Sequence, residues 1–71
     1  MNDTNRNRLA EAWIDVHLAL EAVETHTKAL ARIAGELGIN SAVLEAVGIQ
    51  KTVSHRSDFA KREAEAYKPA G

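Results

Sequence analysis

The chain contains no cysteine, a single proline, and only one tryptophan, one tyrosine and one phenylalanine. Without cysteine it forms no disulfide and no thiolate metal site, and three aromatic side chains cannot build a large aromatic core. An excess of charge of one sign is also lacking, because nine lysines and arginines nearly balance ten aspartates and glutamates. The net charge of −1 therefore gives no overall positive field of the kind that attracts nucleic acid.

Long hydrophobic runs are lacking as well. No run approaches the roughly 20 apolar residues that a membrane-spanning helix needs, and the polar start MNDTNRNR has no apolar stretch of the signal-peptide kind. We therefore expect a cytoplasmic protein with no membrane partner. Its 71 residues suffice for one small domain over residues 1–71, and a core of that size commonly needs a partner subunit for stability.

What the chain does have is a regular apolar pattern. Hydrophobic residues recur at alternating spacings of four and three from Leu9 to Leu37, which is typical of a helix with one apolar stripe. A second, weaker stripe with the same alternation follows. The first stripe comprises Leu9, Trp13, Val16, Leu20, Val23, Thr27, Leu30, Ala34 and Leu37, and the second comprises Val43, Ala46, Gln50, Val53, Ser57, Ala60, Ala64 and Tyr67.

The predicted fold is all-α, a long antiparallel two-helix hairpin. The helices should cover about residues 4–37 and 41–67, with a turn at 38–40, because Gly38 tolerates the left-handed conformation that ends many helices. Two helices joined by so short a turn must fold back on each other. Pro69 is predicted to end the second helix.

Counting outward from the turn predicts which residues of the two helices face each other. Trp13 should lie opposite Tyr67, and Phe59 should lie opposite Leu20. A lone hairpin would leave half of each stripe in water, so we expect a homodimer that forms a four-helix bundle or a coiled coil. The residues assigned to the seam of the hairpin or of its dimer are Leu9, Val16, Leu20, Val23, Leu30, Leu37 and Val53.

The segment around the turn resembles the helix-turn-helix family of DNA-binding domains. The run from Ile33 to Ser41 carries the apolar–Ala, Leu-Gly-apolar and small polar positions of that motif. This resemblance implies a DNA-binding transcriptional regulator, which is the alternative function, and it requires the first helix to break near Thr25–Thr27. The second helix lacks the basic and amide side chains that read bases, so we do not expect nucleic acid as the main partner.

Catalytic and metal chemistry find little support in the sequence. His17 and Glu21 share a helical face, but no HExxH pair and no Glu-x-x-His pair occurs. The four glycines are scattered and form no phosphate-binding loop. We therefore predict a protein that is not an enzyme, with no catalytic residues, no metal ligands and no cofactor.

Polar residues interrupt both stripes at Thr27, Gln50 and Ser57. Such residues can control register or line a small niche between helices. Alternatively, they bond to backbone carbonyls or lie at a loosely packed edge. The sequence leaves both interpretations open.

The favoured function is protein–protein interaction, by a small helical dimer that acts as an adaptor, inhibitor or regulator of a larger protein. Large apolar and aromatic side chains carry most interface energy, and acidic residues steer association toward a basic surface. We expect a protein partner with a basic or apolar groove. The residues predicted to bind it are Trp13, Ile14, Leu18, Phe59, Tyr67, Glu11 and Asp15.

Overall fold

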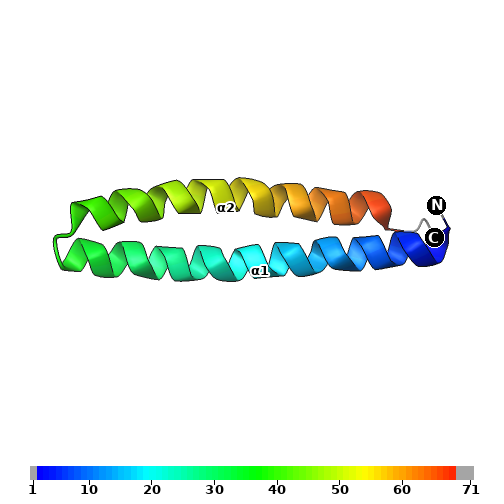
Figure 1. Ribbon diagram of the computed structural model, residues 1–71, viewed down its shortest axis with the longest axis horizontal. Helices are drawn as coiled ribbons and strands as arrows, with labels where there is room; N and C mark the ends of the chain where they lie inside the picture. Colours follow the sequence, from blue (N-terminus) through cyan, green and yellow to red (C-terminus); the bar gives the residue numbers. More distant parts are fainter. Residues whose placement is uncertain (1, 69–71) are drawn as a thin grey trace.

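The computed structural model describes residues 2–68 and consists of two helices that lie side by side in opposite directions (Figure 1). Helix α1 spans Asp3–Glu36 and helix α2 spans Asn40–Tyr67, so the predicted helical hairpin is confirmed. The molecule is a rod with extents of 53 × 15 × 14 Å. Pro69, which was predicted to end the second helix, lies outside the described residues.

Helix α1 runs unbroken through its two central threonines. The Thr25 hydroxyl donates to the Glu21 carbonyl at 3.2 Å, and the Thr27 hydroxyl donates to the Val23 carbonyl at 2.7 Å. These bonds keep both hydroxyls satisfied within the helix. The break that the helix-turn-helix interpretation requires therefore does not form, and α1 and α2 instead pack along their whole length (Figure 1).

The turn between the helices is a helix stop of the Schellman type. Gly38 has a φ of 72°, in the left-handed region that glycine adopts without a steric cost. The Ile39 amide bonds to the Ala34 carbonyl at 2.9 Å, and the Gly38 amide bonds to the Gly35 carbonyl at 3.2 Å. Together these bonds satisfy the last carbonyls of α1 and turn the chain back.

The interior of the hairpin is built from small side chains. Among residues 2–68, none of the larger side chains is fully buried. The buried apolar residues are Ala10, Ala34, Ala46, Val53, Ala60 and Ala64, and the buried polar residues are Thr27 and Ser57. The narrow interior follows directly, because short side chains let two helix axes approach closely.

The face that α1 turns toward α2 differs from the predicted stripe at every second position. Trp13, Leu20, Thr27 and Ala34 are buried or half-buried, as the stripe requires. Between them, however, the inner seam contains the residues that follow the predicted ones. This inner seam comprises Ala10, Trp13, His17, Leu20, Glu24, Thr27, Ala31 and Ala34, all of them buried or half-buried.

Four residues of the predicted seam therefore do not lie between the helices. Val16, Val23, Leu30 and Leu37 remain 43–69% exposed in the single hairpin, so α2 does not cover them, and their assignment to the seam of a dimer stays a prediction. The physical reason is size, since α2 packs on the side of α1 where Ala10 and Ala31 allow close approach. By contrast, Leu9 is half-buried, Val53 is buried, and every member of the α2 stripe is buried or half-buried.

The pairing between the helices is also shifted relative to the prediction. The Trp13 ring meets the Phe59 ring edge to face, with centroids 5.7 Å apart, instead of facing Tyr67. Phe59 therefore lies opposite Trp13, which is farther from the turn than Leu20, its predicted partner. Trp13 therefore faces an α2 residue eight positions earlier in the chain than predicted.

Two glycine substitutions should shift stability in opposite directions. Gly48→Ala should raise the free energy of unfolding by about 0.5–1 kcal/mol, because this glycine lies within α2 and an added Cβ meets nothing within 4 Å. Gly38→Ala should lower it by about 1–2 kcal/mol, because alanine strains the left-handed turn. Chemical denaturation at one protein concentration measures both, and a shift of the same sign in both variants would contradict this account.

Candidate functional site

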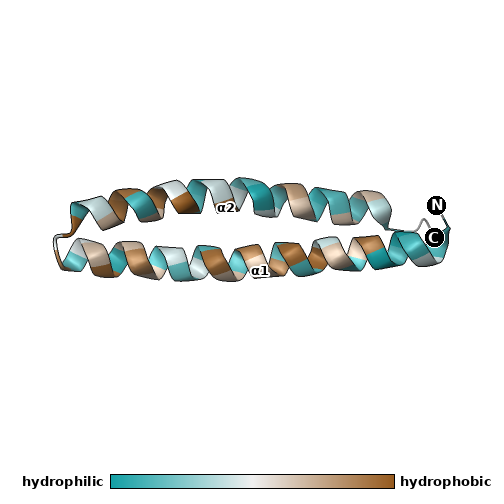
Figure 2. Cartoon of the chain, viewed as in Figure 1, coloured by the Kyte–Doolittle hydropathy of each residue, from teal (hydrophilic) through white to brown (hydrophobic). Residues whose placement is uncertain are grey.

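Most exposed apolar residues of α1, together with the half-buried Leu9 and the polar His26, form a second stripe, the outer seam. Its members alternate at spacings of three and four, so they lie on one face of the helix. Figure 2 shows hydrophobic segments recurring along most of α1, whereas those of α2 gather toward the turn. The outer seam comprises Leu9, Ala12, Val16, Ala19, Val23, His26, Leu30, Ile33 and Leu37.

The outer seam lies beside the inner seam and not behind it. Each of its members from Leu9 to Ile33 immediately precedes an inner-seam residue, and successive helical residues are about 100° apart. Helix α1 therefore has two adjacent packing faces, of which α2 covers one. Two such faces are what a helix at the corner of a four-helix bundle presents to its two neighbours.

The outer seam is long as well as apolar. From Leu9 to Leu37 it extends for about 42 Å at 1.5 Å per residue. Phe59, which is 38% exposed and stacked against Trp13, extends the apolar surface onto α2. Monomeric proteins rarely expose a continuous apolar surface of this kind, which makes the outer seam the candidate interaction surface.

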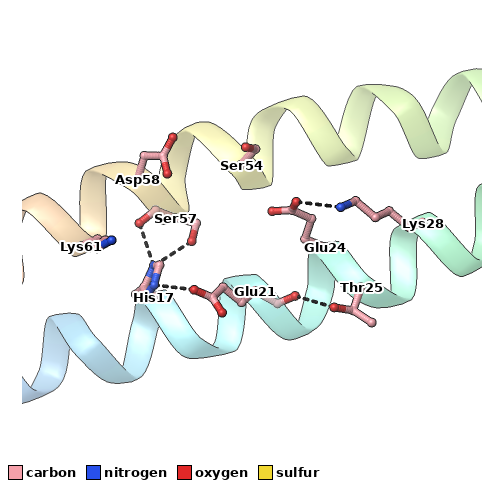
Figure 3. Close-up of a pocket in the computed structure, with 9 residues that line it drawn as sticks. All are labelled: His17, Glu21, Glu24, Thr25, Lys28, Ser54, Ser57, Asp58 and Lys61. Carbon is pink, nitrogen blue, oxygen red and sulfur yellow. Dashed lines mark hydrogen bonds and ion pairs between the residues drawn. The ribbon is translucent and has the colours of Figure 1, made fainter.

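A polar groove occupies another part of the surface between the helices (Figure 3). Its α1 side carries the pair Glu24–Lys28, whose charged atoms are 3.4 Å apart. The groove is lined by His17, Glu21, Glu24, Thr25, Lys28, Ser54, Ser57, Asp58 and Lys61. Its polar lining contrasts with the apolar outer seam, so the hairpin has chemically distinct surfaces.

His17 links the two helices within this groove. Its Nδ1 lies 2.8 Å from the Ser57 hydroxyl and 3.0 Å from the Ser57 carbonyl oxygen, and its Nε2 lies 2.5 Å from a Glu21 carboxylate oxygen. When Nε2 carries the proton, it donates to Glu21 and Nδ1 accepts from the Ser57 hydroxyl. Figure 3 shows the imidazole between the carboxylate on its own helix and the serine on α2.

The order hydroxyl, imidazole, carboxylate also occurs in hydrolytic triads. Here, however, Ser57 is only 4% exposed and lies inside a helix, whose amides bond to its own carbonyls. The backbone amides around Ser57 are therefore not free to form an oxyanion hole, and its nearly buried hydroxyl is poorly placed to attack a substrate carbonyl. We therefore interpret the contact between His17 and Ser57 as a structural cross-link that fixes the register of the helices.

The sequence did not reveal this cross-link, because His17 is not a member of the predicted stripe. A signal was present in Ser57, a polar residue in an apolar stripe that needs a partner when buried. The buried Thr27 hydroxyl finds its partner within its own helix, because it donates a hydrogen bond to the Val23 carbonyl. The polar interruptions at Thr27 and Ser57 are therefore satisfied by hydrogen bonds.

The predicted partner-binding residues do not form one patch. Ile14 and Leu18 are 40% and 55% exposed and share a helical face with the exposed Glu11 and Asp15. Phe59 instead extends the apolar surface that begins at the outer seam. The remaining two predicted residues, Trp13 and Tyr67, are half-buried between the helices.

Within residues 2–68, no group of three or more histidine, aspartate or glutamate side chains is placed to hold a metal ion. Over the same residues, neither helix contains a stretch long and apolar enough to cross a membrane.

Comparison with known proteins finds no matching family model, no similar curated protein and no similar solved structure.

Removing the imidazole of His17 should destabilise the hairpin measurably. His17→Ala leaves the buried Ser57 hydroxyl without its partner on α1, so the free energy of unfolding should fall by about 1–3 kcal/mol. The matched control His55→Ala removes an exposed imidazole from α2 and should change it by less than about 0.5 kcal/mol. Thermal and chemical denaturation give the comparison, and equal effects would show that the cross-link contributes nothing.

Proposed function

We propose that this protein is a non-catalytic interaction module, a helical homodimer that acts as an adaptor or inhibitor of a larger protein. The observation that carries this proposal is the exposed outer seam of α1. It repeats for the length of the helix, it is separate from the face that packs on α2, and α2 leaves it in water.

The composition of the hairpin interior supports self-association. Alanines occupy five of its six buried apolar positions, so the hairpin alone buries little of its larger apolar surface. The exposed members of the outer seam include the larger apolar side chains that the interior lacks. Covering a half-exposed valine or leucine contributes roughly 1 kcal/mol, and each contact made across a two-fold axis occurs twice.

A second surface remains available when the outer seam is covered. Glu11, Ile14, Asp15 and Leu18 recur at positions i, i+3, i+4 and i+7, which places them together on one face of α1. This face combines two exposed apolar anchors with two carboxylates. A partner with an apolar groove and a basic rim matches it, since opposite charge speeds encounter and apolar contact holds the complex.

Substitution of the outer seam should dissociate the dimer. Val23→Glu places a charge at its centre, and sedimentation should then show a monomer where the wild-type chain at micromolar concentration is a dimer. Leu18→Glu is the matched control, because Leu18 is exposed but lies off the outer seam. This variant should remain dimeric, and a monomeric wild-type chain would overturn the proposed dimer.

Substitution of the second face should abolish binding of the partner protein and leave the dimer intact. In affinity purification from the native host, the Leu18→Glu variant should lose a protein that the wild-type chain retains. Helicity by circular dichroism and the dimer by sedimentation should stay unchanged. A protein retained equally by wild type and variant would show that this face is not the partner site.

A further inference from the structure

We propose that the second copy packs antiparallel along the outer seam in one particular register, with Arg8 of each copy beside Glu36 of the other. This inference rests on the proposed function, because it specifies the geometry of that dimer. It is carried by the charge pattern along one edge of the outer seam and by the sizes of the residues within it.

The edge in question consists of residues that immediately precede every second member of the outer seam. They lie at intervals of seven, so they form a line along α1 on the side away from the inner seam. This edge comprises Arg8, Asp15, Ala22, Ala29 and Glu36, all exposed except the half-buried Ala29. It is therefore positive at one end, negative at the other and uncharged around Ala22.

Charge decides between parallel and antiparallel packing. In a parallel dimer this edge of each copy faces the opposite flank of the other copy's outer seam. That flank consists of uncharged inner-seam residues, so Arg8, Asp15 and Glu36 find no charged partner there. In the antiparallel dimer centred near Ala22, opposite charges meet at both ends, and Asp15 lies beside the uncharged Ala29.

The same register matches large residues to small ones. In an antiparallel pair of helices, the two alternating positions of a seam face each other across the interface. The facing pairs are then Leu9 with Ile33, Ala12 with Leu30, Val16 with His26 and Ala19 with Val23. Two bulky residues on each copy thus meet alanines, which lets the helices interdigitate without overpacking.

Neighbouring registers lose these matches. A shift of one heptad in one direction places Asp15 beside Glu36, and a shift in the other places Arg8 beside Ala29. The centre near Ala22 also lies close to the midpoint of α1, which spans Asp3–Glu36, so the helices overlap for nearly their whole length. Burial, charge and size therefore select one arrangement.

Disulfide cross-linking tests the register cleanly, because the chain has no cysteine of its own. Arg8→Cys and Glu36→Cys chains should form a disulfide with each other when mixed under mild oxidation, and neither should cross-link with itself. Ala22→Cys, at the two-fold axis, should cross-link with itself. Self-linkage of Arg8→Cys, or no linkage between the mixed chains, would overturn the antiparallel register.

Charge reversal gives a second measurement that introduces no cysteine. Arg8→Glu should weaken dimerisation about tenfold, because two symmetric ion pairs become repulsive. The double variant Arg8→Glu with Glu36→Arg should restore the wild-type dissociation constant. Failure of the double variant to restore it would overturn the register while leaving the dimer intact, whereas a monomeric wild-type chain would overturn the proposed function itself.

Discussion

The close approach of two helices through alanine is the constraint on which the rest of this structure depends. Ala10 and Ala34 on α1 face a helix whose fully buried positions are Ala46 and Ala60. A seam of such small residues brings the axes together and leaves space for few larger side chains between them, such as Leu20 and Val53. Most of the larger apolar residues of α1 lie instead on the adjacent face, where they form the outer seam.

An alanine-rich seam has little to distinguish one register from the next, because alanine offers similar contacts wherever it is placed. The polar residues in the seam supply the missing specificity. His17 reaches the hydroxyl and the carbonyl of Ser57 at 2.8 and 3.0 Å, and this contact exists in one alignment of the helices only. A buried polar pair thus fixes a position that apolar packing alone would leave poorly defined.

The hairpin itself could be predicted from local signals, because Gly38 ends one helix and the apolar spacing resumes after it. The face that meets α2 could not. The predicted stripe and the inner seam share Trp13, Leu20, Thr27 and Ala34. At the intervening positions the predicted stripe contains the larger apolar side chains, which made it the more hydrophobic of the two faces. Hydrophobicity measures how strongly a face avoids water, and it does not say which of two adjacent faces meets a given neighbour. Helix α1 stays continuous at Thr25–Thr27 for a local reason, since both threonine hydroxyls bond to carbonyls of their own helix.

The hairpin also brings the beginning of α1 beside the end of α2, where the Arg6 guanidinium donates to the Ala66 carbonyl at 3.2 Å. The first residues of α1 and the last residues of α2 therefore lie together at one end of the 53 Å rod (Figure 1). Such a rod can project from a surface loop of another domain without separating the segments that flank it. Its geometry is that of a helical hairpin that can be inserted into another protein, with the turn at Gly38 at its far end.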